Sequence, residues 1–224
     1  MIINFLIIIQ ENMIELDNVS KRIKEKIVLD NINIVFHDGN VYGVKGINGS
    51  GKTMLMRIIS GLIYPTTGKV LIDGKELGKD ISFPEEMGLL IENPVFLDSY
   101  TGADNLRLLA SLNGTASNED IMEALGKVGL DYSDKRKYRK YSLGMKQRLG
   151  IAATIMEHPG IIVWDEPLNA LDTEGVRLFN EIIKEEKEKG TLIIMSCHDE
   201  IRLNEYSDVI VVMENGRILS VEGE

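Results

Sequence analysis

The residues best suited to chemistry lie at 46–53, where the chain reads Gly-Ile-Asn-Gly-Ser-Gly-Lys-Thr. This octapeptide fits the phosphate-loop pattern of a glycine, four residues, then Gly-Lys-Thr. Glycine-rich backbone can turn its N–H groups around phosphate oxygens, and a helix that starts directly afterwards points its positive end at the same anion. We expect Lys52 to bind the β- and γ-phosphates of a nucleoside triphosphate and to assist catalysis, and the Thr53 hydroxyl to hold Mg²⁺. The other nucleotide-binding residues predicted in this loop are Gly46, Asn48, Gly49, Ser50 and Gly51.

The residues on either side of the loop predict the elements that a phosphate loop needs. An apolar run at 41–44 (Val-Tyr-Gly-Val) predicts a buried strand before it, and 54–59 (Met-Leu-Met-Arg-Ile-Ile) predicts a helix after it. A glycine turn with a chance lysine is the alternative, and the strand–loop–helix context argues against it. The loop alone fits a kinase, a GTPase or a transport ATPase, so the rest of the chain has to decide.

A second chemical motif stands at the end of another apolar run. Residues 161–164 (Ile-Ile-Val-Trp) predict a buried parallel strand, and Asp165 and Glu166 follow it directly. Beside a phosphate loop, Asp165 is expected to hold Mg²⁺ through water, and Glu166 to act as the general base that activates the attacking water. Acidic strand ends are common in surface loops, but the phosphate loop favours the catalytic interpretation.

Composition limits the classes of protein that need to be considered. The chain has 224 residues, enough for one large α/β domain, and it is 44% hydrophobic and 27% charged. Its formal net charge of −10 argues against nucleic acid as a partner. The single cysteine, Cys197, excludes an internal disulfide and suits a reducing compartment.

The first nine residues are nearly all apolar, and two interpretations of residues 1–12 are open. The run is shorter than the roughly 20 apolar residues that a transmembrane helix requires. No Lys or Arg precedes Lys21, so the charged front of a signal peptide is missing. The segment is either an extra edge strand or a translated leader ahead of Met13, where a strand pattern begins; we favour the leader.

The remaining signals alternate between strands and helices and predict an α/β fold. Alternation at 28–36 predicts a half-exposed strand, Pro-Thr-Thr-Gly at 65–68 predicts a turn before a strand at 69–72, and Asn-Gly at 215–216 predicts a hairpin. The stretch from about 94 to 141 carries only helix signals. Its basic run, Lys135 to Lys140, is interpreted as solvated surface, with a phosphate or partner contact as the alternative. The predicted helix N-caps are Thr101, Ser117 or Asn118, and Asp172, and Ser142 precedes a further helix predicted from Met145 to Met156.

Residues 141–145 (Tyr-Ser-Leu-Gly-Met) resemble the signature motif of ATP-binding cassette (ABC) proteins, usually written Leu-Ser-Gly-Gly-Gln. Ser142 and Gly144 match that motif, and the other three positions depart from it. Residues 167–172 (Pro-Leu-Asn-Ala-Leu-Asp) resemble the family's D-loop. A lone histidine is more often structural, but His198 follows an apolar strand and resembles the family's switch histidine, the catalytic sensor of the γ-phosphate. The resemblance extends from residue 13 to residue 220.

The resemblance implies an α/β fold with a P-loop RecA-like core, an antiparallel β-subdomain and an inserted α-helical subdomain at about 94–145. The ABC ATPase domain would span 13–224. Two copies would pair head to tail, each ATP lying between the phosphate loop of one copy and Ser142 and Gly144 of the other. ATP and Mg²⁺ are the implied cofactors. A membrane permease is the implied partner, which holds the chain at the cytoplasmic face of the cell membrane without direct membrane contact.

Two positions depart from the family's pattern. The family commonly stacks an aromatic ring on adenine, and Ile23 occupies that position here; we place Ile23 and Val28 among the nucleotide-binding residues and leave nucleotide selectivity open. Residues 88–94 (Gly-Leu-Leu-Ile-Glu-Asn-Pro) align with the Q-loop, where Glu92 replaces the usual glutamine as the predicted ligand of nucleotide and Mg²⁺. With 101–106 (Thr-Gly-Ala-Asp-Asn-Leu), this stretch is similar to cassettes of bacitracin-resistance and lantibiotic-immunity exporters.

Three classes of function compete. We favour an ATPase subunit that powers a separate permease, an exporter of antimicrobial peptides or drugs. The second class is a soluble cassette ATPase for iron–sulfur assembly or repair, but the chain shows neither a long coiled-coil insertion nor a tandem cassette. The third is a GTPase or small-molecule kinase, but no Asn-Lys-x-Asp tetrapeptide occurs and such kinases need neither Ser142 nor His198. No motif identifies the transported substrate, the permease or the direction of transport.

Overall fold

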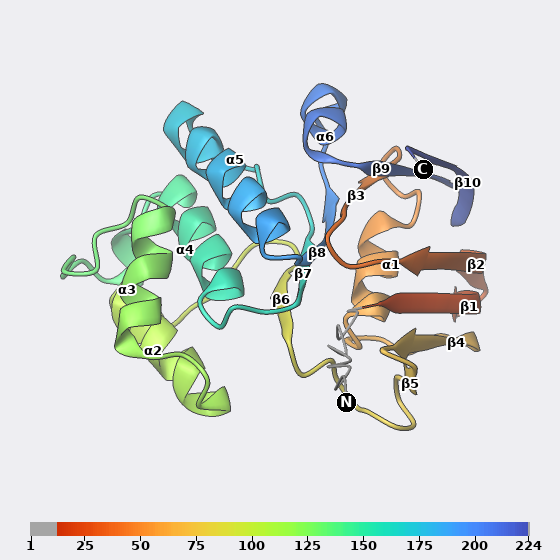
Figure 1. Cartoon of the computed structure of the whole chain (residues 1–224), viewed down its shortest axis with the longest axis horizontal. Helices are drawn as coiled ribbons and strands as arrows, with labels where there is room; N and C mark the ends of the chain where they lie inside the picture. The colour runs from red at the N-terminus through yellow and green to blue at the C-terminus, as the bar shows by residue number, and fades with distance from the viewer. Residues whose placement is uncertain (1–12, 224) are drawn as a thin grey trace, which may run out of the picture.

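The computed structural model describes residues 13–223, which form two β-sheets with helices between and beside them (Figure 1). The predictions for residues 1–12 lie outside the described residues. The strands are β1 (Ile14–Ile23), β2 (Lys26–Phe36), β3 (Val41–Lys45), β4 (Thr67–Ile72), β5 (Lys75–Glu76), β6 (Met87–Leu90), β7 (Ile161–Trp164), β8 (Leu192–Ser196), β9 (Val209–Glu214) and β10 (Arg217–Glu222). The helices are α1 (Lys52–Ile59), α2 (Gly102–Asn113), α3 (Asn118–Lys127), the 3₁₀ turn η1 (Tyr138–Lys140), α4 (Leu143–Ile155), α5 (Thr173–Glu188) and α6 (Glu200–Tyr206).

The larger sheet brings the predicted motifs to one edge. Its strand order is β10-β9-β3-β8-β7-β6; the strands from β9 to β6 run parallel, and β10 returns antiparallel to β9. Because parallel strands end at the same edge of a sheet, the loops after β3, β6, β7 and β8 gather there. These loops contain the phosphate loop, Glu92, Asp165 with Glu166, and His198, in that order.

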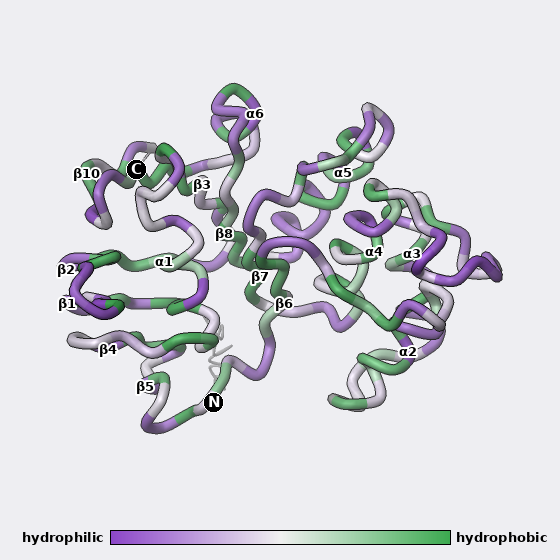
Figure 2. Tube along the Cα trace, turned by 180° about the vertical axis from the view of Figure 1, so that it is seen from behind, coloured by the Kyte–Doolittle hydropathy of each residue, from purple (hydrophilic) through white to green (hydrophobic). Residues whose placement is uncertain are grey.

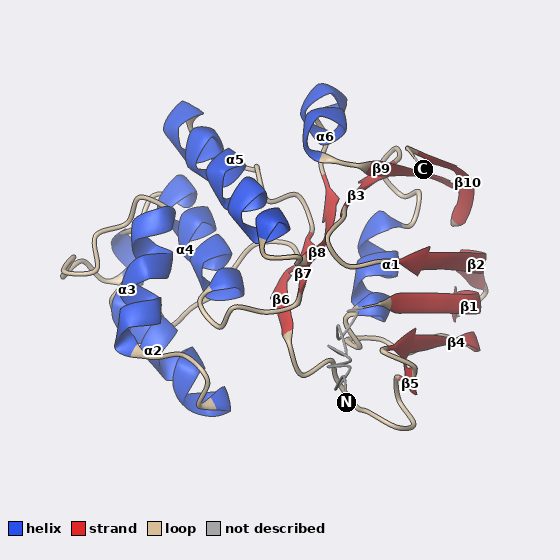
Figure 3. Ribbon diagram, in the orientation of Figure 1, coloured by secondary structure: helices blue, strands red, loops and turns tan. Residues whose placement is uncertain are grey.

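The central strands of this sheet are buried on both faces, as their continuous apolar runs predict. In β7, Ile161 and Val163 contribute to the core that contains α1, whereas Ile162 and Trp164 contribute to the core that contains α2 to α5. Successive side chains of a strand point to opposite faces, so one short strand supports both cores. Figure 2 shows β6, β7 and β8 as the hydrophobic centre, and Figure 3 shows α1 on one side of them and α2 to α5 on the other.

The smaller sheet is antiparallel, with the order β2-β1-β4-β5, and it covers α1 from the side opposite the larger sheet (Figure 1). The predicted turn at 65–68 is wrong in its second half, because Thr67 and Gly68 already belong to β4. Gly68 has φ +80°, and a Cβ there would lie 2.3 Å from the carbonyl oxygen of Asn18. The glycine therefore serves a close strand contact at an irregularity of the β1–β4 pair, not a turn.

The predicted N-caps Thr101, Ser117 and Asp172 each accept a backbone N–H of the helix they precede, and Ser142 does the same for α4. Within the range 94–145, predicted as a helical insertion, the structure has α2, α3, η1 and the first residues of α4, and no element of either sheet. The short strand β5 and the helix α6 were not predicted. No helix of residues 13–223 is both long enough and apolar enough to cross a membrane.

Candidate nucleotide site

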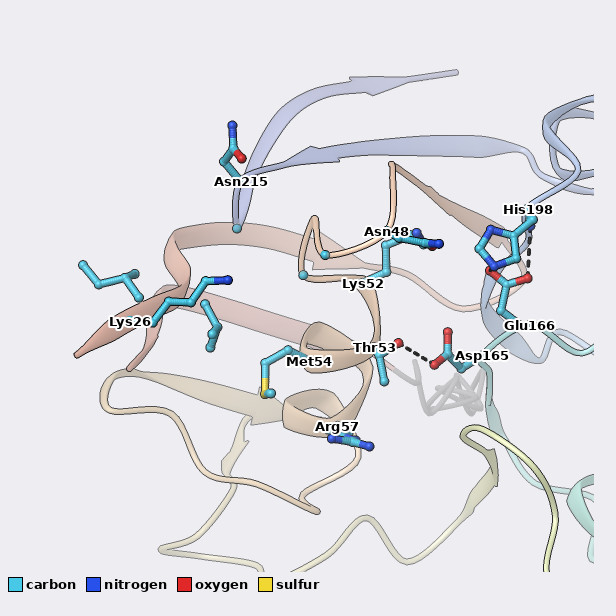
Figure 4. Close-up of a pocket in the computed structure, with 15 residues that line it drawn as sticks. Lys26, Asn48, Lys52, Thr53, Met54, Arg57, Asp165, Glu166, His198 and Asn215 are labelled. Carbon is cyan, nitrogen blue, oxygen red and sulfur yellow. Dashed lines mark hydrogen bonds and ion pairs between the residues drawn. The ribbon is translucent and has the colours of Figure 1, made fainter. Parts of the chain in front are cut away.

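A cavity of about 500 Å³ opens where the strands of the larger sheet end, beside the start of α1 (Figure 4). The residues that line it come from the first hairpin, the phosphate loop and α1, the ends of β7 and β8, and the β9–β10 turn. They are Lys26, Ile27, Val28, Asn48, Gly49, Gly51, Lys52, Thr53, Met54, Arg57, Asp165, Glu166, His198, Asn215 and Gly216. The fold thus brings together the phosphate loop and the two acidic residues, which are more than 100 positions apart in sequence.

The phosphate loop is shaped to hold an anion. Gly49 and Gly51 have φ of +83° and +110°, in the left-handed region that residues with a side chain rarely adopt. α1 begins at Lys52 without a side-chain cap and without an acidic residue in its first turn, so its first N–H groups are available to a ligand. The hydroxyl of Ser50 is buried and has no hydrogen-bond partner among the described residues. An unpartnered buried hydroxyl and an uncapped helix start fit a bound phosphate group.

Lys52 lies across the loop that it follows. Its side chain is largely buried, and Nζ donates to the carbonyl oxygen of Gly46 at 2.5 Å. Lys52 lines the cavity together with Asn48, Asp165 and Glu166 (Figure 4). An ammonium group in that position can neutralise phosphate charge, which is the role predicted for it.

Asp165 is held by hydrogen bonds from two neighbouring elements. Thr53 Oγ1 donates to its Oδ2 at 2.7 Å, and Ser196 Oγ donates to its Oδ1 at 2.6 Å. The carboxylate is almost fully buried, so these bonds fix its orientation. A hydroxyl and a carboxylate oxygen side by side are the hard donors that Mg²⁺ prefers, with phosphate oxygens and water completing its shell. Among residues 13–223 there is no group of three or more His, Cys, Asp or Glu side chains that could hold a metal.

Glu166 and His198 lie side by side, and the backbone at Glu166 is strained. The Glu166 backbone has φ +54°, its Oε2 accepts the backbone N–H of His198 at 3.0 Å, and its Oε1 lies 3.3 Å from His198 Nε2. Burial raises the pKa of the Glu166 carboxyl above its ordinary value, and the facing His198 opposes that rise. A carboxylate with a raised pKa is a stronger base than an ordinary glutamate, as general-base catalysis requires.

Two further residues position this loop and were not predicted. Ser196 accepts the backbone N–H of Glu166 at 3.0 Å while it donates to Asp165. Gln147 of α4 donates to the carbonyl oxygen of Pro167 at 3.0 Å. Ser196 is the last residue of a fully buried strand, and a polar residue at such a position was the available signal. Gln147 has no signal beyond its place two residues after the signature-like pentapeptide.

Glu92 lies outside the cavity lining, past the end of the strand that pairs with β7. It follows β6 by two residues, and the carbonyl oxygen of Leu90, the last residue of β6, accepts the backbone N–H of Asp165 at 2.7 Å. Its carboxylate is exposed and pairs with Arg57 of α1, with Nη2 and Oε1 at 2.5 Å. Arg57 lines the cavity, so the predicted metal ligand is one side chain removed from it.

The first hairpin lines one end of the cavity, and two of the three residues that it contributes were not predicted to bind nucleotide. Lys26, Ile27 and Val28 line this end, whereas Ile23, which pairs with Lys26 across the tip of the first hairpin, does not. Val28 is thus placed at the cavity, and the role of Ile23 remains a prediction. The β9–β10 turn closes this end, since the N–H of Gly216 donates to the carbonyl oxygen of Ser50 at 2.9 Å.

Ser142 and Gly144 are not brought to this cavity. Ser142 is exposed and caps α4, where its Oγ accepts the backbone N–H of Met145 at 3.2 Å. A Cβ on Gly144 would lie 2.9 Å from the carbonyl oxygen of Ala170, so a glycine suits the close approach of the D-loop-like segment. Figure 1 shows α4 and α1 on opposite sides of the central strands.

Fold and site together define a P-loop nucleoside triphosphatase with an antiparallel sheet over α1 and a helical layer beyond the central strands. The model of the ABC transporter family matches residues 29–169, and the chain belongs to this family. It is the ATP-binding subunit of an ABC transporter and an ATPase.

Relatives match over almost the whole chain. An uncharacterized ABC transporter ATP-binding protein of Bacillus subtilis, YybJ, is 45% identical over 94% of this chain and 96% of its own length. The bacitracin transport ATP-binding protein BcrA of Enterococcus faecalis is 38% identical over 94% of this chain and 69% of its own. The lantibiotic transport ATP-binding protein SrtF of Streptococcus pyogenes is 34% identical over 92% of this chain and 89% of its own length.

Solved structures support the same assignment. An ATP-binding subunit of an ABC transporter superposes with a TM-score of 0.87 at 26% identity, covering 94% of this chain and 90% of that chain. The dimeric ATP-binding cassette MJ0796 superposes with a TM-score of 0.84 at 25% identity, covering 94% of this chain and 98% of that chain. That structure is in a post-hydrolysis state and is bound to ADP and Pi.

Proposed function

We propose that two copies of this chain pair head to tail and that ATP hydrolysis in the pair powers a separate membrane permease that exports antimicrobial peptides. The observation that carries the pairing is the division of the site. The phosphate loop, Asp165, Glu166 and His198 meet at one cavity, whereas Ser142 stands exposed at the start of α4, outside it. One chain by itself thus offers its bound nucleotide no contact with a signature-like helix start.

Hydrolysis is assigned to the residues at the ends of β7 and β8. Glu166 takes the proton of the attacking water, and the oxygen available for this is Oε1, which makes no hydrogen bond among the described residues. The backbone N–H of His198 fixes the other oxygen. Lys52 and the start of α1 would hold the phosphate oxygens. The oxygen of the water then bonds the γ-phosphorus as the bond from that phosphorus to the bridging oxygen breaks, and ADP leaves. Thr53 and Asp165 would hold Mg²⁺, which when bound neutralises charge on the β- and γ-phosphates.

The second copy would complete the site with the start of its α4. Ser142 and the first N–H groups of α4 present a hydroxyl and the positive end of a helix dipole to solvent. Both suit the γ-phosphate of a nucleotide held by the other copy. Nucleotide would thereby join the pair, and loss of the γ-phosphate would release it.

The permease and the peptide cargo are supported by the relatives. BcrA is named for bacitracin transport and SrtF for lantibiotic transport, and both match over more than nine-tenths of this chain. We therefore place this chain at the cytoplasmic face of the cell membrane, held there by a permease, with peptides of the bacitracin or lantibiotic type as cargo. Glu92 lies between the catalytic edge and the helical segment, a position suited to pass nucleotide state to that permease.

Pairing is tested with the Glu166→Gln variant, which keeps the ATP site and lacks the base. Light scattering is expected to show a monomer without nucleotide and a dimer with Mg²⁺-ATP. Adding Ser142→Arg should abolish the dimer and leave ATP binding to each monomer intact. The control Ser111→Arg, on the exposed face of α2, should leave both the dimer and ATP binding intact. A dimer that forms without ATP, or that survives Ser142→Arg, would contradict head-to-tail pairing.

The cargo is tested in cells that carry the chain and the permease that co-purifies with it. Expression is expected to raise the concentrations of bacitracin or of a lantibiotic that inhibit growth, and Glu166→Gln should remove the protection. An unrelated small antibiotic serves as the control. Equal sensitivity to the peptides with and without the active chain would refute peptide export while leaving the ATPase assignment in place.

A further inference from the structure

Arg57 connects the nucleotide cavity to the loop that carries Glu92. It follows Thr53 by four residues on α1, so the two side chains lie on the same face of the helix, one turn apart. Thr53 bonds the metal-binding Asp165, and Arg57 bonds Glu92 at 2.5 Å. Figure 4 shows Arg57 one turn below Thr53 at the rim of the cavity. One helix face therefore contacts both acidic residues predicted to hold Mg²⁺.

The loop that Arg57 contacts is strained and leads directly into the helical segment. Glu92 has φ +60°, a backbone conformation that costs a residue with a side chain energy unless neighbouring contacts hold it. Two residues later, the carbonyl oxygen of Pro94 accepts the hydroxyl of Tyr138 at 2.6 Å. Glu92 thus lies two residues from a hydrogen bond that ties its loop to the helical segment.

We propose that Arg57 is a positioning residue that holds Glu92 away from the metal site until nucleotide enters the cavity. The guanidinium and Mg²⁺ compete for the same carboxylate, and Arg57 is exposed to the incoming triphosphate because it lines the cavity. Negative charge in the cavity draws the guanidinium and weakens its hold on Glu92. The inference rests on the proposed role of Glu92 toward Mg²⁺, and it adds the residue that sets when this role begins.

The size of the effect follows from the exposure of the pair. The side chains of Arg57 and Glu92 are 30% and 63% exposed, so water screens their attraction. Exposed ion pairs contribute about 0.2–1 kcal/mol, which corresponds to a factor of roughly 1.4 to 5 in an equilibrium constant. This range suits a contact that has to open in each cycle.

The test measures Mg²⁺-dependent ATP binding in a Glu166→Gln background, where hydrolysis does not interfere. Half-saturating Mg²⁺ is determined for four proteins: the parent, Arg57→Gln, Glu92→Gln and the double variant. Arg57→Gln also removes a cation from the cavity, but the effect of that loss is the same with and without Glu92. The double-mutant cycle formed by the four proteins therefore isolates the interaction between Arg57 and Glu92. Arg177→Gln on α5, which breaks exposed ion pairs of a residue outside the cavity lining, is the matched control.

We expect Arg57→Gln to shift the half-saturating Mg²⁺ concentration downward by about 1.4- to fivefold more when Glu92 is present than when Glu92→Gln is also present. Arg57→Lys, which keeps the charge and the fold but loses the planar guanidinium, should show a smaller shift in the same direction. Equal shifts in both backgrounds would refute the pairing and leave the metal role of Glu92 standing. A Glu92→Gln curve identical to that of the parent would refute both.

Discussion

Replacing Ser196 with alanine tests whether the catalytic carboxylates are held in place from β8. The Ser196 side chain is fully buried, donates to Asp165 Oδ1 at 2.6 Å and accepts the backbone N–H of Glu166 at 3.0 Å. Alanine removes both bonds without adding volume. It leaves one carboxylate oxygen and one backbone N–H without that partner inside the site.

The expected cost follows from these two bonds. A hydrogen bond to a charged group contributes about 1.5–3 kcal/mol, and a neutral one contributes about 1 kcal/mol. Allowing for partial rescue by water at the cavity, we expect Ser196→Ala to lower the free energy of unfolding by about 2 kcal/mol or more. For a chain of this length each kcal/mol lowers Tm by roughly 2–4 °C, so the loss should be at least about 4 °C.

Activity should fall as well, because Glu166 loses the contact that fixes its strained backbone. Urea unfolding and steady-state ATP hydrolysis, both compared with Ser220→Ala on the exposed strand β10, provide the measurements. The expected pattern is a lower kcat with a smaller change in ATP affinity, because the phosphate loop is untouched. An unfolding free energy and a kcat both equal to those of Ser220→Ala would refute the positioning role of Ser196.

Three further predictions concern the base, the nucleoside end and the helical segment. Burial raises the pKa of the Glu166 carboxyl above the ordinary value of 4.5, and this carboxyl acts as a base only when it is ionised. The rate of hydrolysis should therefore fall as the pH drops through a value above 4.5. An acidic limb of the kcat/KM profile at or below pH 4.5 would contradict this. Ile27→Ala should weaken ATP binding about fivefold, as expected for roughly 1 kcal/mol of lost apolar contact. Ile23→Ala, at a similarly exposed residue outside the cavity lining, should not weaken it. The reverse order in a binding titration would show that Ile23, and not Ile27, contacts the nucleotide. Ser117→Ala removes the capping box of α3 and should lower the free energy of unfolding by about 1 kcal/mol in urea, with ATP affinity unchanged; an unaltered unfolding curve would show that the cap is dispensable.

The sequence was informative about the fold wherever local chemistry decides the structure. Continuous apolar runs predicted β3, β7 and β8, because a strand covered on both faces needs no polar residue. The Asn215-Gly216 turn and the helix caps depend on backbone conformation and on one or two neighbouring side chains, so they too were predictable. The start of β4 was not predictable from the sequence, because Gly68 allows a close contact with Asn18 that exists only after β1 and β4 have paired.

The site was predictable to the extent that its residues belong to contiguous motifs. Lys52, Thr53, Asp165 and Glu166 were named from local patterns and His198 from the family resemblance, and the structure places all five at one cavity. The residues that orient them come from other elements, as Ser196 and Gln147 do, and no spacing along the chain indicates such contacts. The partner of Glu92 could not be foreseen for the same reason. Arg57 occupies a helix position where a basic residue is ordinary, and only the fold brings β6 to that face.

The three acidic residues at this sheet edge differ in how firmly the fold holds them, and the difference agrees with the roles proposed for them. Asp165 is buried and has both oxygens bonded, which suits a fixed metal ligand. Glu166 has one oxygen fixed by the His198 backbone and one that makes no hydrogen bond within residues 13–223, which suits a base that must reach a water molecule. Glu92 is exposed and held by a single ion pair on a strained backbone, which suits a group that has to move. Hydrogen exchange offers a direct comparison: on adding Mg²⁺-ATP, amides around Glu92 should change protection most and those at the end of β7 least.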